Sequence, residues 1–504
     1  MITYTTNGRN LVEQKTDVYT LFFDDSYVWD NKLDQLAARY YLPLKQVMEN
    51  TKFAGRAGDI VSVHGSDGDR PVLLVILGLG SITRAQGDRL DACRRAVGHL
   101  VRAVERTKMG TVAIAMPDEH WFAVDAYTLA KEMVSTFSMA AYHFDQFITD
   151  DSRKHRTDYT VILCAPALLH DAINVGIEHG KHLGFAVNQA RHWCDLPPCV
   201  LTPTHMADHA ERIAKTHDLK CTVFNEQQVS DMNMGGLLAV SQGSVQECRL
   251  VILEYRTSRP DAPTLALVGK GVTFDSGGLS IKPAARMDEM KDDMAGAAAV
   301  ISTMELLAHL KPEINVIGLA PLTENLPSGS AVKPGDVIQF YNGKTAEIKN
   351  TDAEGRLILA DALAYAVKHY SPDAIINIAT LTGSCAYALG PFFCGLMSQH
   401  EDLSKRVFEA SRVSGDRAWP LPFHDDFRPA VRSTVADLCN EGNATYRAGA
   451  ITAGFFLQSF VGDRPWVHLD VAGTSFNVPD ISYYRPGATG FGVRLFAELI
   501  MNWK

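Results

Sequence analysis

The chain has 504 residues, of which 46% are hydrophobic and 21% are charged. This composition is typical of a globular protein and excludes disordered, collagen-like and coiled-coil chains, while the length predicts two or three domains. The formal net charge of -10 argues against generic binding to nucleic acid or to anionic membranes, because both depend on concentrated lysine and arginine. Small or neutral partners are therefore expected.

The cysteines and the N-terminal segment indicate a reducing compartment. Nine cysteines are scattered without a Cys-x-x-Cys pair, and their odd number does not suit a disulfide framework. The opening MITYTTNGRNLVEQ lacks the apolar segment of a secretory signal. Polar residues, glycines and a proline interrupt the uncharged stretch 374–400, which we interpret as a buried strand followed by a loop. We expect a cytoplasmic protein without membrane association.

Up to residue 165, short strand-like runs alternate with helical patterns, which predicts an N-terminal α/β domain over 1–165. The predicted strands are 18–23, 71–78, 111–116 and 159–165, and the predicted helices are 84–107 and 120–142. A long helical stretch follows and stops at Leu196-Pro197-Pro198. It predicts a connecting helix over 166–195.

The remainder of the chain, 196–504, is predicted to form a larger C-terminal domain. Its predicted strands are 265–272, 314–322 and 374–381, and its predicted helices are 290–310 and 356–370. These strands are continuous apolar runs, which is typical of strands buried on both faces. We therefore expect a mixed or mainly parallel sheet with helices on both faces, in which ligands bind beyond the carboxyl ends of the strands.

Charged residues gather in two segments of the C-terminal part, and their types suit metal binding. The first segment contributes Lys270, Asp275, Lys282 and Asp293, and the second contributes Asp352, Glu354 and Arg356. Clustered carboxylates repel one another unless cations lie between them. Oxygen ligands of this kind suit divalent metals, and several of them can bridge a metal pair. The pattern favours a divalent-metal site.

Each piece also has a simpler structural interpretation. Thr351-x-x-Glu354 matches a capping box, and acidic residues in a first helical turn favour the helix dipole. The Asp-Ser-Gly-Gly run at 275–278 suits a tight turn, Asp293 can simply begin a helix, and lysines are usually solvated. Taken alone, none of these pieces establishes a function.

Taken together, the two segments resemble the leucyl aminopeptidase family, also called the cytosol aminopeptidases. The first motif is VGKGVTFDSGG (268–278). NTDAEGRL (350–357) follows it, is that family's signature octapeptide and stands here without substitution. Asp275, Lys282 and Asp293 follow Lys270 by five, twelve and 23 residues, which are the family's intervals. The resemblance extends over most of 196–504, including GSAVKPGDVI, ATLTG, HLDVAGT and GATG. It implies that 196–504 is the catalytic peptidase domain.

The resemblance also implies a site for two divalent metal ions. Its metal ligands would be Lys270, Asp275, Asp293, Asp352 and Glu354. Zinc or manganese is expected, with magnesium and cobalt as alternatives. Lys270 can ligate a metal only as a neutral amine, which requires a strongly lowered pKa.

The implied activity is the release of N-terminal neutral or apolar residues from peptides by a water that two metals activate. Lys282 would stabilise the oxyanion, and Arg356 would hold a bicarbonate ion that serves as general base. The implied wall residues of the pocket are Met290, Asn350, Thr380, Gly383 and Ala472. A methionine wall is adaptable and apolar, which suits leucine-like substrates with a free N-terminus. The resemblance further implies a homohexamer.

Two other functions are weighed against this one. The run 274–278 is similar to the nucleophile motif of trypsin-like serine proteases, with Ser276 as nucleophile, but the α/β alternation contradicts an all-β double barrel. Some members of the family also bind DNA, and 84–108 carries seven basic residues, beginning with Arg84. Residues 1–165 nevertheless hold 19 Lys+Arg against 21 Asp+Glu, so a solvated basic helix face is the simpler interpretation.

Overall fold

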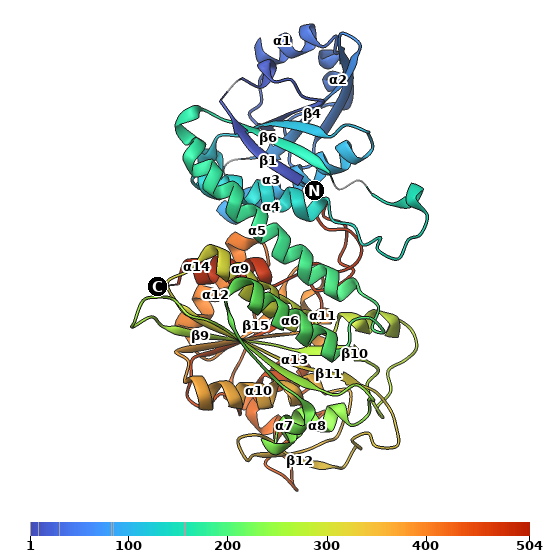
Figure 1. Ribbon diagram of the computed structural model, residues 1–504, viewed down its shortest axis with the longest axis vertical. Coiled ribbons are helices and arrows are strands. Elements are labelled where there is room, and N and C mark those ends of the chain that lie inside the picture. The colour runs from blue at the N-terminus through green and yellow to red at the C-terminus, as the bar shows by residue number, and fades with distance from the viewer. Residues whose placement is uncertain are drawn as a thin grey trace. The chain divides into compact units, whose positions relative to one another are not determined.

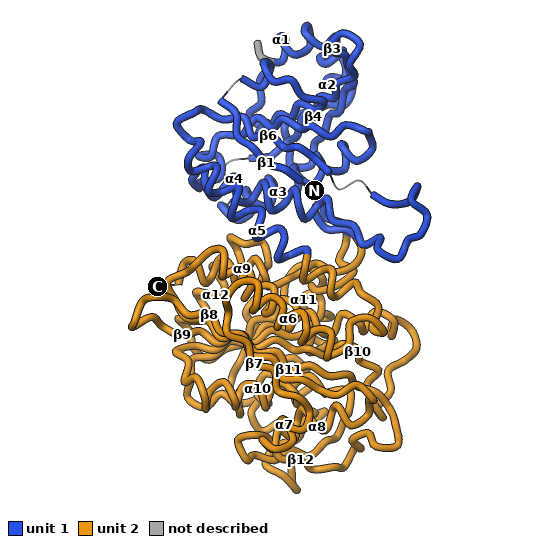
Figure 2. Tube along the Cα trace, viewed as in Figure 1, with its two compact units in different colours: residues 1–188, 480–485 blue, residues 189–479, 486–504 orange. Residues whose placement is uncertain are grey.

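The computed structural model describes residues 2–8, 10–29, 31–81, 83, 85–155 and 158–503, without the side chains of residues 31 and 32. Its contacts divide the chain into unit 1, Met1–Asn188 with Asp480–Arg485, and unit 2, Gln189–Pro479 with Pro486–Lys504 (Figure 2). Both are α/β structures and unit 2 is the larger, which confirms the predicted fold class. Across the described ranges, no helix combines the length and the apolarity that crossing a bilayer requires.

Unit 1 is built on a six-stranded sheet in the order β1-β6-β5-β2-β4-β3, in which only the β3–β4 pair is antiparallel. The strands are β1 (Ile2–Asn7), β2 (Val18–Asp24), β3 (Ile60–Asp67), β4 (Arg70–Gly80), β5 (Thr111–Ala115) and β6 (Tyr159–Cys164). The helices are α1 (Asn31–Arg39), α2 (Leu44–Thr51), α3 (Gln86–Glu105), α4 (Ala126–Ala140) and α5 (His170–Asp195). The sequence predicts the four inner strands and misses β1 and β3, because partly exposed edge strands lack a continuous apolar run.

Helix α5 continues from unit 1 into unit 2, because its residues up to Asn188 belong to unit 1 and those from Gln189 onward belong to unit 2. Gly176, Gly180 and Gly184 lie one turn apart along the helix. A Cβ atom on Gly176 would lie only 2.4 Å from the carbonyl oxygen of Tyr127 in α4. The missing side chains thus allow α5 to pack directly on α4.

The arginines of helix α3 make contacts inside unit 1. The side chain of Arg94 is fully buried, and its guanidinium lies 2.8 Å from the carboxylate of Glu132 in α4. Arg102 donates to two backbone carbonyls of the segment Asp480–Arg485. Arg84, which the sequence places in the same basic stretch, lies outside the described residues. These two arginines of the basic stretch thus hold unit 1 together.

Unit 2 contains a nine-stranded mixed sheet in the order β16-β15-β18-β14-β9-β11-β8-β7, with β10 paired to β11. Its strands are β7 (Lys220–Phe224), β8 (Arg249–Tyr255), β9 (Thr264–Gly269), β10 (Gly271–Asp275), β11 (Asn315–Asn325), β14 (Ala374–Ala379), β15 (Cys394–Met397), β16 (Ala418–Pro420) and β18 (Trp466–Asp470). A small separate sheet contains β12 (Val337–Gln339), β13 (Thr345–Glu347) and β17 (Leu438–Cys439).

Helices cover both faces of the large sheet (Figure 1). One layer contains α6 (Pro203–His217), α9 (Ala295–Leu310), α12 (Glu401–Ser414) and α14 (Val493–Met501). The other contains α8 (Gly235–Ser241), α10 (Gly355–Tyr370) and α13 (Gly449–Gln458), with α7 (Glu226–Asp231) packed on α8. The strands between these layers are buried on both faces, which explains their continuous apolar sequences.

Three predicted elements of unit 2 are more finely divided than the sequence suggests. The predicted strand 265–272 is interrupted at Lys270, between β9 and β10. The predicted helix 290–310 consists of a 3-10 turn, Met287–Asp292, followed by α9. The predicted loop after β14 contains a helix, α11 (Gly383–Leu389), and the strand β15. The first two breaks place charged residues at the ends of elements.

The parallel strands of unit 2 end at one edge of the sheet, and the polar residues of interest lie there. Strands β9, β11, β14 and β18 run parallel to one another. Lys270 follows β9, Asn325 ends β11, Thr380 follows β14 and Asp470 ends β18. The carboxyl ends of neighbouring parallel strands therefore bring together residues that are distant in sequence.

Replacing Arg94 by methionine is expected to destabilise the protein by about 3–5 kcal/mol, because the buried carboxylate of Glu132 would lose its guanidinium partner. Replacing both residues, Arg94→Met with Glu132→Leu, removes both charges and is expected to recover most of that loss. Calorimetric thermal unfolding of the three proteins measures the effect. A double variant that is as unstable as Arg94→Met would contradict the expectation.

Candidate active site

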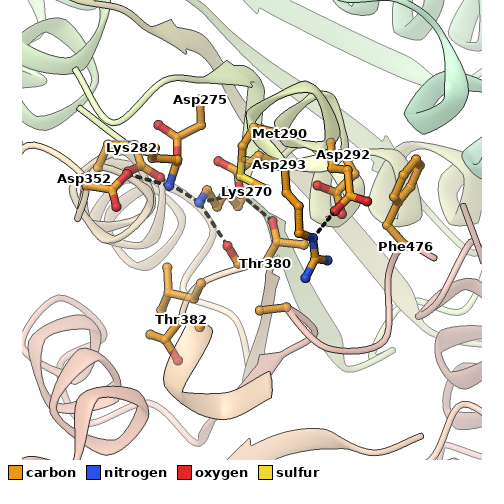
Figure 3. Close-up of a pocket in the computed structure, with 16 residues that line it drawn as sticks. Lys270, Asp275, Lys282, Met290, Asp292, Asp293, Asp352, Thr380, Thr382 and Phe476 are labelled. Carbon is orange, nitrogen blue, oxygen red and sulfur yellow. Dashed lines mark hydrogen bonds and ion pairs between the residues drawn. The ribbon is translucent and has the colours of Figure 1, made fainter. Parts of the chain in front are cut away.

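A cavity of about 220 Å³ lies at the carboxyl edge of the large sheet of unit 2 (Figure 3). The predicted site residues that line it are Lys270, Asp275, Lys282, Met290, Asp293, Asp352, Glu354, Thr380, Gly383 and Ala472. Lining residues outside the prediction are Arg286, Glu289, Asp292, Leu381, Thr382 and Phe476. The structure thus brings the two motif segments into one cavity.

Three carboxylates face one another in this cavity. Asp275 ends β10, Asp293 precedes α9 and Glu354 precedes α10, and each is at most 5% exposed. Carboxylate oxygens of the three residues all lie within 4.8 Å of one another. Asp293 Oδ2 and Glu354 Oε2 are buried and have no hydrogen-bond partner among the described residues. Open carboxylate oxygens this close together fit a divalent cation.

The burial of this cluster perturbs its acid–base equilibria. Burial and then the Glu354 carboxylate raise the pKa of Asp275 to about 6, against the opposing effect of Lys282 and Lys270. Burial also raises the pKa of Asp293 well above its ordinary value. For Glu354, burial raises the pKa, but the two lysines outweigh it and the net direction is downward.

Lys270 lies among these carboxylates. Its Nζ is 2.7 Å from Asp293 Oδ1 and 2.7 Å from Glu354 Oε1, and it donates to the carbonyl oxygen of Thr380 at 3.0 Å. The side chain reaches this position by passing Gly355, where a Cβ atom would lie only 2.6 Å from Lys270 Cε. A side chain at position 355 would therefore displace the end of Lys270 from this position.

The protein's own charges do not lower the pKa of Lys270. Burial lowers this pKa, but Asp293 and Glu354 outweigh burial and raise it above its ordinary value. A metal could bind Lys270 only if the positive charge of the bound ion lowered this pKa.

Lys282 connects the two motif segments. Its Nζ lies 2.7 Å from Asp275 Oδ2 and 2.5 Å from Asp352 Oδ1 (Figure 3). The side chain is 21% exposed, so it remains open to the cavity. Burial lowers the pKa of Lys282, but the surrounding carboxylates, with Asp275 first, raise it above its ordinary value. Lys282 is thus a cation that faces the cavity.

Arg356 and Asn350, both predicted as site residues, are not among the residues that line the cavity. Arg356 is 8% exposed, and its Nη1 donates to the carbonyl oxygen of Asn440 at 2.6 Å. Its Nε is buried without a hydrogen-bond partner in the described part of the chain. The side-chain amide of Asn350 donates to Glu441 Oε1 at 3.2 Å, away from the cavity wall that the prediction assigns to it.

Asn325 holds the two motif segments together, and the sequence analysis does not identify it. Its side-chain Nδ2 donates to Asp275 Oδ1 at 2.9 Å and to the carbonyl oxygen of Thr351 at 3.0 Å. Thr351 in turn donates its hydroxyl to the carbonyl oxygen of Gly277 at 2.7 Å. The capping-box interpretation is therefore wrong, since Thr351 bonds to the other motif and the N-cap of helix α10 is Glu354, which makes no side-chain capping hydrogen bond.

The serine-nucleophile interpretation also fails. Ser276 is 3% exposed and does not line the cavity. Its Oγ donates to the carbonyl oxygen of Asn325 at 2.7 Å and accepts from the amide of Gly278. The hydroxyl fixes the turn after β10 and is not available as a nucleophile.

Asp292 is a further buried carboxylate of the cavity, and the motifs do not indicate it. It accepts a hydrogen bond from Ser475 Oγ at 2.9 Å, and burial raises its pKa to about 6. Its only sequence signal is its position next to Asp293. The pocket therefore contains polar wall residues beside Met290 and Phe476.

Both units of the chain match domains of one known family. The catalytic domain of the cytosol aminopeptidase family matches residues 188–497, and the N-terminal domain of the same family matches residues 21–151. A relative from Roseiflexus castenholzii, named a probable cytosol aminopeptidase, is 40% identical over 466 residues, covering 92% of this chain and 93% of the relative. A relative of the same name from Chlorobaculum tepidum is 41% identical over 466 residues, covering 90% of each chain.

Solved structures agree with these matches. A mutant of tomato leucine aminopeptidase superposes with a TM-score of 0.87 at 28% identity, covering 99% of this chain and 96% of the other. The bottromycin maturation enzyme BotP in complex with Mn superposes with a TM-score of 0.83 at 30% identity, covering 97% of this chain and 99% of the other. These matches agree with a cavity that collects buried carboxylates beside lysines. The chain therefore belongs to the cytosol aminopeptidase family and is a metal-dependent peptide hydrolase.

Proposed function

We propose that this protein releases neutral and mainly apolar residues, leucine among them, from the N-termini of peptides at a two-metal site. The observation that carries the proposal is the cluster of Asp275, Asp293 and Glu354, whose oxygens lie within 4.8 Å of one another inside the cavity. Asp293 and Glu354 each retain a buried oxygen without a partner among the described residues. Such a cluster is stable only beside additional positive charge.

The residues that would hold the ions are Lys270, Asp275, Asp293, Asp352 and Glu354. Two divalent ions bound there supply Lewis acidity, which lowers the pKa of a water molecule and polarises the scissile carbonyl. The manganese complex of the BotP structure supports manganese, and zinc, magnesium and cobalt suit the same donors.

Lys282 would stabilise the negative charge that develops on the carbonyl oxygen. The surrounding carboxylates keep it cationic, and its side chain is open to the cavity. A fixed cation at this position acts in a largely dehydrated site, where a charge-assisted hydrogen bond is strong.

Arg356 would hold an anion beside the start of helix α10. Its buried Nε lacks a partner in the described residues, which fits a small planar anion such as bicarbonate. A bicarbonate bound there supplies a general base for the attacking water.

The wall of the pocket would select the N-terminal side chain. Met290, Phe476 and Ala472 would offer apolar surface to that side chain, and Thr380 and Gly383 after β14 line the same cavity. An adaptable methionine suits leucine, methionine and residues of similar size. We further propose a homohexamer in the cytoplasm, as the family resemblance and the relatives' description as cytosol aminopeptidases suggest.

Hydrolysis of leucine p-nitroanilide tests the proposed activity. Chelator-treated protein is expected to be inactive and to recover turnover when Mn²⁺ or Zn²⁺ is restored. N-acetyl-leucine p-nitroanilide is expected to remain uncleaved, because an acylated nitrogen cannot serve as a ligand in the site. Equal cleavage of both substrates, or turnover that survives full metal removal, would contradict the proposal.

Lys282→Ala is expected to lower kcat by about 10²- to 10³-fold, because it removes a donor to the developing oxyanion. Metal content is expected to stay unchanged, because the change leaves all five ligands in place and makes the site more negative. Elemental analysis and steady-state kinetics give the two values. Lys333→Ala, which removes an exposed lysine paired with Asp336, is the control and should keep wild-type kcat. A Lys282→Ala enzyme with wild-type kcat would rule out the assigned role.

Asn325→Leu is expected to weaken Mn²⁺ binding by about 10- to 100-fold, because Asp275 would lose the hydrogen bond that orients it. Mn²⁺ titration by calorimetry measures this change. Asn315→Leu, at the opposite end of the same strand β11, removes a comparable side-chain amide and is the matched control. If the two variants bound Mn²⁺ equally well, Asn325 would have no part in the metal site.

A further inference from the structure

Two sequence motifs contribute to the cavity without providing a metal ligand or a proposed catalytic group. ATLTG (379–383) and HLDVAGT (468–474) follow or include the ends of strands β14 and β18. Residues 380–383 of the first motif and Ala472 of the second line the cavity. The conformation of these two loops therefore sets the shape of the pocket.

We propose that Asp470 is the positioning residue that fixes both of these loops and thereby sets the side-chain selectivity of the pocket. This inference rests on the proposed aminopeptidase function. Asp470 is fully buried, and its Oδ1 accepts from the amides of Leu381, Thr382 and Ala472 at 3.1, 3.4 and 3.2 Å. Its Oδ2 accepts from Thr382 Oγ1 at 2.6 Å. One carboxylate thus bonds to both loops.

The register of the sheet explains why one residue can reach both loops. Strands β14 and β18 are parallel, and Asp470 lies directly opposite Ala379. The two loops therefore leave the sheet at the same level, and the Asp470 carboxylate accepts hydrogen bonds from the first residues of each. Four hydrogen bonds, three of them from backbone amides, reach this carboxylate. A buried carboxylate with several amide donors is a rigid anchor.

The anchor acts on the pocket wall beyond the metal ligands. Thr380 has its own contacts with the ligands, since its hydroxyl donates to Asp293 Oδ1 at 2.8 Å and its carbonyl accepts from Lys270. Asp470 bonds to the next two residues, Leu381 and Thr382, and to Ala472 in the loop after β18. Loss of the anchor is therefore expected to shift the wall while the metal ligands stay in place.

An amide at position 470 cannot replace the carboxylate. Thr382 Oγ1 donates to Asp470 and already accepts from Ser384 Oγ at 3.1 Å and from the amide of Cys385 at 3.2 Å. The amino group of an asparagine would face a hydroxyl that has no further acceptor capacity to offer. Asp470→Asn therefore breaks this contact although it barely changes the size of the side chain.

The test compares kcat/KM for leucine and alanine p-nitroanilides in four variants. Asp470→Asn and Thr382→Val are each expected to lower the leucine-to-alanine ratio by about tenfold, mainly through a higher KM for leucine, with metal content unchanged. Thr382→Ser restores the hydroxyl and is expected to recover the selectivity that Thr382→Val loses. Asp416→Asn is the matched control, because Asp416 is a buried carboxylate that binds the Gly492 amide and Arg494 and does not line the cavity. It should lower the melting temperature without changing the ratio.

Hydrogen exchange gives a second measurement that does not depend on turnover. Peptides covering 379–386 are expected to exchange faster in Asp470→Asn than in the wild type and to be unaffected in Asp416→Asn. The inference would be overturned if Asp470→Asn and Thr382→Val kept the wild-type ratio within about twofold, or if Asp416→Asn lost selectivity equally. If the wild type cleaved neither substrate, the proposed function would fail, and unchanged exchange in Asp470→Asn would still decide against the anchor.

Discussion

The burial of several carboxylates in one cavity is the constraint on which the rest of this site depends. Asp275, Asp293 and Glu354 are each nearly inaccessible, and like charges this close together are unfavourable without compensating cations. Lys270 and Lys282 compensate part of this charge. Asp293 and Glu354 each keep one carboxylate oxygen without a partner among the described residues, so part of the negative charge is not compensated there. This is the electrostatic reason to expect divalent ions in the cavity.

The sheet of unit 2 supplies the geometry that this charge cluster needs. Its parallel strands end at one edge, so residues far apart in sequence meet there without long connections. Two buried polar side chains then fix the loops that leave this edge. Asn325, at the end of β11, joins the two motif segments of the cavity, and Asp470, at the end of β18, joins the two loops of the pocket wall.

Much of the fold, and which charged residues meet in one cavity, could be predicted from the sequence for identifiable reasons. Strands buried on both faces appear as apolar runs, and the two motifs contain carboxylates and lysines that the fold brings together in one cavity. The edge strands β1 and β3 lack such a pattern. Asn325 and Asp470 could not be found because their partners lie 50 and 89 residues away in sequence, and no local pattern encodes those hydrogen bonds. The capping-box alternative for Thr351 fails for the same reason, since its hydroxyl bonds across to Gly277.

Anomalous diffraction at the manganese absorption edge, from crystals grown with Mn²⁺, tests the central claim most directly. Two manganese peaks per chain are expected among Lys270, Asp275, Asp293, Asp352 and Glu354. An empty carboxylate cluster would contradict this account, as would manganese bound only at the exposed group of Asp118, Glu119 and His120 in unit 1.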